Sequence, residues 1–148
     1  MSDLLDAVRM GDIDTVLLLL DNGADPHAHD DGALGWAILK GDAKIVKILI
    51  AKGANIHARD GCMPRWVARL GCVEILQAMF SADNVFNAGE DPRGYRFFGI
   101  RFNNAIIVAA GCRWFDINKA RKHWANNPDA LTRVEQITQW AAGGNYNE

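Results

Sequence analysis

Three glycines recur in the first half of the chain at a fixed spacing of thirty residues, at Gly11, Gly41 and Gly71. Each follows a short apolar stretch that contains alanine and precedes a second stretch of helical character. Two of the three units then close with a further glycine, Gly23 or Gly53, again thirty residues apart. A fixed period of this length indicates a solenoid, in which each unit buries its apolar face only against its neighbours. Such a chain presents an extended binding surface rather than an enclosed active site.

The residues that carry this period resemble the ankyrin repeat: a short helix, a glycine turn, a second helix, a Gly-Ala pair and an extended finger. The resemblance covers residues 1–88, in units over 1–30, 31–60 and 61–88. The period is shorter than the usual ankyrin period of about 33 residues, and the missing residues fall in the finger. Trp36 and Trp66 stand before small apolar residues, where the usual Thr-Pro-Leu-His opening is absent. This form is similar to the ankyrin subtype frequent in viral proteins.

Residues 89–148 have no such period and predict a small α+β module that caps the stack. Residues 88–94 are a turn-rich connector, and aromatic alternation over 95–102 predicts a strand. Asn103-Asn104 fits a two-residue hairpin turn, with a return strand over 105–110. Capping residues before 117 and at Asn127-Pro128 then predict two helices. The fold class is therefore mainly α, a three-unit solenoid capped by a β-hairpin and two helices.

The run from Ile107 to Trp124 is similar to a small module at the C-terminus of various bacteriophage proteins. Together with the viral type of repeat, this resemblance favours a phage or mobile-element origin. It implies no activity that could be transferred to this chain.

Composition limits the class of protein further. An apolar content of 49% is enough for a folded core, and no window is long enough to span a membrane. The first residues include Asp3 and Asp6 rather than a basic, apolar leader, so we expect a soluble, cytoplasmic protein. Cys62, Cys72 and Cys112 are odd in number and sparse, as expected for reduced thiols. Residues 1–30 hold seven Asp and one Arg, an acidic end that can orient a partner.

Two clusters could carry chemistry. His27, His29 and His57, with the neighbouring carboxylates Asp30 and Asp31, could bind zinc or nickel. We favour a structural role, because these residues lie at repeated finger positions, and we predict no metal and no cofactor.

Cys112 and His123 could form a thiolate–imidazole pair. No third orienting group is evident, and the sequence has neither a phosphate-binding loop nor a serine elbow. We therefore predict that the protein is not an enzyme.

A nucleic-acid-associated function is the alternative from another class. The C-terminal module carries basic residues interleaved with aromatic ones, which could contact phosphates and bases. The module is only mildly basic and the whole chain is acidic, with a net charge of −2, so nucleic acid is an unfavoured partner. The basic residues are Arg93, Arg96, Arg101, Arg113, Lys119, Arg121 and Lys122.

The favoured function is protein binding through the concave surface that the resemblance implies. Trp36 and Trp66 recur at equivalent positions, so we expect both to pack between units. Residues before the turn glycines and around the fingers are the expected binding residues: Arg9, Met10, Asp31, Leu39, Lys40, Arg59, Gly61, Arg65 and Arg69. If the chain is encoded by a phage, the partner would be a host protein, whose defence function could be inhibited.

Overall fold

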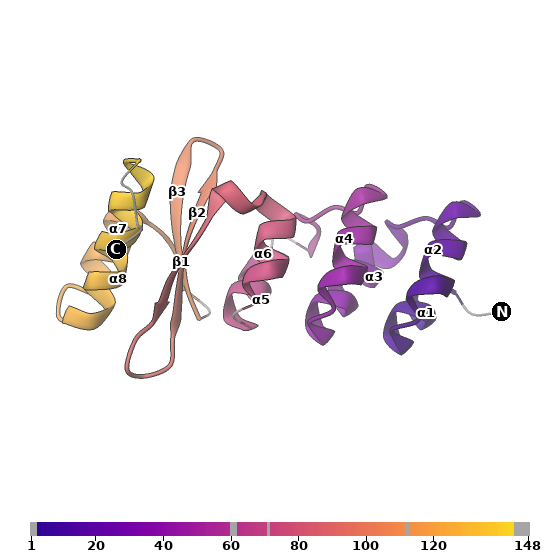
Figure 1. Cartoon of the computed structure of the whole chain (residues 1–148), viewed down its shortest axis with the longest axis horizontal. Helices are drawn as coiled ribbons and strands as arrows, with labels where there is room; N and C mark the ends of the chain where they lie inside the picture. The colour runs from indigo at the N-terminus through magenta and orange to yellow at the C-terminus, as the bar shows by residue number, and fades with distance from the viewer. Residues whose placement is uncertain (1–2, 60–61, 71, 112, 144–148) are drawn as a thin grey trace.

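In a computed structural model, three helix pairs stand side by side in a row, followed by a β-sheet and two further helices (Figure 1). The structure describes residues 3–59, 62–70, 72–111 and 113–143. The first helices of the three pairs are called the inner helices and the second ones the outer helices. The pairs are α1 (Leu4–Met10) with α2 (Ile13–Asp21), α3 (Ala28–Lys40) with α4 (Ala43–Ala51), and α5 (Cys62–Leu70) with α6 (Val73–Phe80).

Local capping explains where the helices of a pair begin and end. Asp12 accepts a hydrogen bond from the backbone N–H of Thr15, and Asp42 caps α4 in the same way. Gly11 ends α1 with φ of 75° and Gly41 ends α3 with φ of 71°, a left-handed conformation that glycine adopts without strain. The first helix is capped by Asp3, whose side chain accepts a hydrogen bond of 2.8 Å from the backbone N–H of Asp6.

The finger between the first two units is a left-handed turn rather than an extended hairpin. His29, Asp30 and Asp31 have φ between 54° and 57°, inside the range assigned to α3. His and Asp are among the non-glycine residues that tolerate this conformation best. The shortened repeat is therefore accommodated by a compact turn.

This turn buries Asp31, which the sequence placed on the exposed binding surface. Its side chain accepts a hydrogen bond of 2.6 Å from the backbone N–H of Asn55 and lies 3.2 Å from His27 Nδ1. Only 4% of the residue is exposed. The prediction of an exposed Asp31 was wrong, because its carboxylate links one finger to the next.

The C-terminal module contains a four-stranded antiparallel sheet in the order β1-β2-β3-β4. The predicted hairpin is confirmed as its centre, with Asn103 and Asn104 at φ of 49° and 61° in the turn. The prediction of a hairpin alone was wrong, because two further strands pair with its edges. The strands are β1 (Val85–Glu90), β2 (Arg96–Phe102), β3 (Ala105–Ala110) and β4 (Arg113–Asp116), and a 3-10 turn, η2 (Ala82–Asn84), precedes them.

The sheet takes the place of a fourth helix pair. Phe98 and Ile100 of β2 join the core of the helix pairs, whereas Phe97 faces α7 and α8 on the other side. This division follows the alternation of side chains along a strand. Phe102 also packs edge-on against Phe80 of α6, with ring centroids 5.5 Å apart. Strand β1 runs across residue 88, where the sequence analysis ends its third unit.

Two helices cover the far face of the sheet. They are α7 (Ile117–His123), capped by Asp116, and α8 (Pro128–Ala141), capped by Asn127. Both start signals were predicted and are confirmed. No helix in the described ranges is both long and apolar enough to cross a membrane.

Candidate functional site

The C-terminal ends of the inner helices form one exposed surface, which we call the inner-helix face. Except for Trp36, its members occupy equivalent positions thirty residues apart. Because the helix pairs stand in one row (Figure 1), equivalent positions lie along the same side of it. Contacts join neighbouring units: Lys40 Nζ donates to the carbonyl oxygen of Arg9, and the Arg9 guanidinium lies over the ring of Trp36. The face consists of Arg9, Met10, Trp36, Leu39, Lys40, Arg69 and Leu70.

Large apolar side chains are concentrated on this face. Seven such side chains are exposed among the described residues, and four belong to it: Met10, Trp36, Leu39 and Leu70. Exposed large apolar side chains that gather on one surface are a feature of interaction sites. Two of the other three, Leu17 and Leu18, lie on the outer helix of the first unit, and the last is Tyr95.

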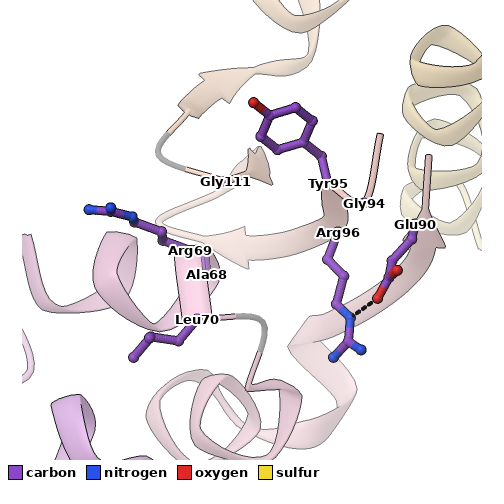
Figure 2. Close-up of a pocket in the computed structure, with 8 residues that line it drawn as sticks. All are labelled: Ala68, Arg69, Leu70, Glu90, Gly94, Tyr95, Arg96 and Gly111. Atoms are coloured by element: carbon purple, nitrogen blue, oxygen red, sulfur yellow. Dashed lines mark hydrogen bonds and ion pairs between the residues drawn. The ribbon is translucent and has the colours of Figure 1, made fainter. Parts of the chain in front are cut away.

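Tyr95 lines a groove of about 730 Å³ at the C-terminal end of the face. Figure 2 shows that Arg69 and Leu70 come from the end of α5 on one side, and that Tyr95, Arg96 and Glu90 come from the β1–β2 segment on the other. Arg96 Nε donates to Glu90 Oε1 over 2.6 Å. The groove therefore exists only because a sheet, and not a fourth helix pair, follows the third unit.

Five of the predicted binding residues lie together on the inner-helix face, and a sixth lies beside it. Arg65 is exposed on α5 one turn before Arg69, on the same side of that helix. Their role in binding stays a prediction. The five on the face are Arg9, Met10, Leu39, Lys40 and Arg69.

The described finger residues, Asp31 and Arg59, do not join this group. Arg59 has a φ of 56°, and its Nη2 donates to the carbonyl oxygen of His29 over 3.3 Å, so it links the first two fingers. Asp31 is buried, as described above. Gly61 lies outside the described residues.

Trp36 was expected to be core, but 41% of it is exposed. Its equivalent, Trp66, packs against the core, with Cζ3 only 3.9 Å from where a Cβ on Gly35 would lie. In the first unit the position equivalent to Gly35 holds Leu5, so a leucine side chain stands where the ring of Trp36 would need room. A comparison of Leu5 with Gly35 in the sequence could therefore have predicted that Trp36 is more exposed than Trp66.

Two histidines of the clusters that could carry chemistry lie against aromatic rings. Within the described ranges, no group of three or more His, Cys, Asp or Glu side chains is placed to hold a metal ion. His57 stacks beside Phe102 at 5.1 Å, and His123 lies 4.9 Å from the ring of Phe115. The proposed partner of His123, Cys112, lies outside the described residues.

Several basic residues of the C-terminal module are held by groups of the protein itself. Arg121 pairs with Glu135 at 2.8 Å, and Arg101 Nη2 donates to the carbonyl oxygen of Trp140 at 3.0 Å. Arg93 pairs with Asp91 at 2.5 Å. These contacts lower the positive potential available to a polyanion.

Asp91 is the buried member of the last pair. Burial raises the pKa of the Asp91 carboxyl, but hydrogen bonds from Arg93 and from the backbone N–H groups of Tyr95 and Arg93 outweigh that effect. Its pKa therefore lies below the usual value for aspartate. An ionised Asp91 holds the β1–β2 loop and, through Arg93, the ring of Tyr95.

Comparison with known families agrees with the helix-pair architecture. The family model described as "Ankyrin repeats (3 copies)" matches residues 4–91, which is more than half of the chain. No curated protein gives a significant match. The match and the three stacked helix pairs together show that this chain belongs to the ankyrin repeat family.

Proposed function

We propose that this protein is a non-catalytic binding protein that holds a partner protein on its inner-helix face. Ankyrin repeats suggest protein–protein interaction in general. The identification of the face, and of the residues on it that bind, is specific to this chain.

One observation carries the proposal: four large apolar side chains are exposed in the same short stretch of successive inner helices. A partner that covered them would gain the hydrophobic free energy of their removal from water. Trp36 and the flanking arginines are also residue types that dominate the energetics of interfaces. The cationic side chains of the face would orient the bound partner and favour partners with negative charge. They are Arg9, Lys40 and Arg69.

We further propose that the partner is a bacterial host protein, which binding would inhibit. Support for this finer statement comes from the resemblance of the short repeats to viral ones and of residues 107–124 to a bacteriophage module. It predicts that a bacterial lysate contains the partner.

The test is affinity capture from a bacterial lysate with immobilised wild-type protein and a Trp36→Ala, Leu39→Ala double variant. The matched control is Leu18→Ala, because Leu18 is also an exposed apolar residue but lies on α2, outside the face. We expect one protein to be enriched by the wild type and the control and lost with the double variant.

Equal capture by all three proteins would refute the assignment of the face. Failure to enrich any protein would count against the host-protein proposal. Circular dichroism of each variant checks that the helix content is unchanged.

Nucleic-acid binding through the C-terminal module is the second candidate function. Its support is the set of basic residues, and the internal ion pairs of Arg93 and Arg121 weigh against it. Binding of labelled DNA or RNA that falls steeply with salt would favour it, and the absence of binding at low salt would remove it.

A further inference from the structure

We infer that the groove between α5 and the β1–β2 segment binds an acidic peptide segment that carries an apolar side chain. This inference rests on the proposed function and deepens it, since it names the class of partner segment and extends the binding surface beyond the ankyrin repeats. The groove is lined by Ala68, Arg69, Leu70, Glu90, Gly94, Tyr95, Arg96 and Gly111.

The charge of the groove selects an anion. The sequence of α5 contains Arg65 and Arg69 and no acidic residue. On the opposite wall the charge of Glu90 is matched by Arg96, which pairs with it at 2.6 Å. The groove and the adjoining turn of α5 are therefore a basic region on a chain whose net charge is −2.

The two arginines of α5 are available to a partner. Neither forms an ion pair or hydrogen bond with any residue in the described part of the chain, and both are exposed. Their positions four residues apart on a helix place them on the same side. A segment with carboxylates could meet both charges without displacing an internal partner.

The apolar component is supplied by Leu70 at the end of α5 and by Tyr95 on the β1–β2 segment, both about half exposed, and their side chains point away from one another (Figure 2). Tyr95 is braced although it is exposed. The Arg93 guanidinium lies 5.0 Å from the centre of its ring, and the ring packs so closely over Gly111 that an added Cβ there would lie 3.1 Å from Tyr95 Cδ1.

Arg93 in turn is fixed by Asp91, whose side chain is fully buried. A ring that is already held in place loses little conformational entropy when a partner packs on it. Tyr95 is therefore suited to anchor an apolar side chain, while Arg69 binds a neighbouring carboxylate.

The test is selection of a random displayed peptide library on the full-length wild-type protein. Affinities of the selected peptides are then measured by fluorescence anisotropy for wild type, Tyr95→Ala, Arg69→Glu, the inner-helix-face variant Leu39→Ala and the control Lys122→Glu. Lys122 is exposed on α7 and does not line the groove, and Lys122→Glu changes the net charge by the same amount as Arg69→Glu.

We expect peptides rich in Asp or Glu with an aliphatic or aromatic residue, whose affinity falls with added salt. Tyr95→Ala and Arg69→Glu should each weaken binding about tenfold, and Lys122→Glu by less than about twofold. A peptide in which one acidic residue is replaced by lysine should regain affinity for the Arg69→Glu protein.

Three results would overturn the inference: no selected peptide, selected peptides without acidic residues, or peptides whose affinity is unchanged by Tyr95→Ala and Arg69→Glu. If Leu39→Ala abolishes peptide binding and Tyr95→Ala does not, the peptides bind the inner-helix face. That result would refute the groove inference and leave the proposed function standing. Peptides that are insensitive to all of these variants would argue against both.

Discussion

The guanidinium of Arg9 lies over the ring of Trp36, 5.0 Å from its centre, and so joins the first inner helix to the second at the surface. Lys40 Nζ donates to the carbonyl oxygen of the same arginine. The two contacts hold an exposed tryptophan in a defined place. An aromatic ring that is fixed but uncovered is the arrangement expected of an interface anchor.

Replacing Trp36 with alanine should therefore weaken partner binding without unfolding the protein. We expect a loss of about 2 kcal/mol of binding free energy, roughly thirtyfold in affinity, as for other interface anchors. The free energy of unfolding should change by less than about 1 kcal/mol, since the ring is outside the core. Titration calorimetry with the captured partner and urea denaturation measure the two quantities. An unfolding penalty as large as the binding penalty would show that the ring is structural.

Gly99 in β2 should tolerate no side chain. A Cβ at this position would lie 2.6 Å from Ile137 Cγ2 and 3.1 Å from the ring of Trp140, both on α8. Gly99→Ala should force α8 away from the sheet and lower the free energy of unfolding by about 1–3 kcal/mol. Urea denaturation followed by circular dichroism measures the change.

Gly35→Ala is the matched control for this prediction. Gly35 is a helical glycine whose added Cβ would meet no atom closer than 3.8 Å. Alanine there should be neutral or raise the stability by about 0.4–1 kcal/mol, since it restricts the unfolded chain. If both glycine variants lost stability equally, crowding against α8 would not be the cause.

Asp31 should contribute to stability through its acceptor oxygen rather than its charge. Asp31→Ala removes the acceptor of the Asn55 N–H bond and places alanine at a φ of 54°, so we expect a loss of about 1–3 kcal/mol. Asp31→Asn keeps an acceptor and tolerates this backbone conformation, so its loss should be smaller. Thermal denaturation of the two variants compares them. If the two variants lost the same stability, the negative charge of Asp31 and not its acceptor oxygen would be the source of the stabilisation.

Asp91 should make the fold sensitive to acid. Its pKa is lower in the folded protein than in the unfolded chain, so its ionised form contributes stability above the unfolded pKa, near pH 4. That contribution should be lost as the pH falls through the folded pKa. Denaturant midpoints measured between neutral pH and pH 3 should fall less steeply for Asp91→Asn than for wild type. If the denaturant midpoints of wild type and Asp91→Asn depended on pH in the same way, protonation of Asp91 would not be coupled to unfolding.

The local features of this fold could be predicted from the sequence because they depend on residues close together in the chain. The turn glycines Gly11 and Gly41 and the start of α8 at Asn127-Pro128 were identified in this way. The turn at Asn103 follows from the same kind of argument, since asparagine accepts positive φ.

Pairing over longer distances could not be predicted in this way. Most of strand β1 lies inside the third unit, 61–88, and its pairing with β2, Val85 opposite Ile100, depends on residues beyond the connector. Strand β4 is too short to show an alternation of its own. Once these strands are formed, the sheet can pack on α5 and α6 and cap the stack.

The candidate site was predicted in part for the same reason. Arg9, Leu39 and Arg69 were predicted because each lies two residues before a turn glycine, a position that is exposed in every unit. Tyr95 was missed as a surface residue, because the groove that exposes it forms only where the sheet meets α5.

Amide hydrogen exchange of this protein, alone and bound to the captured partner, would locate the binding surface on the molecule. We expect slower amide exchange in the complex at the C-terminal ends of α1, α3 and α5 and in the β1–β2 loop, with exchange in the outer helices unchanged. Protection confined to α2, α4 and α6, or to α7 and α8, would contradict it and place the binding surface on another side of the molecule.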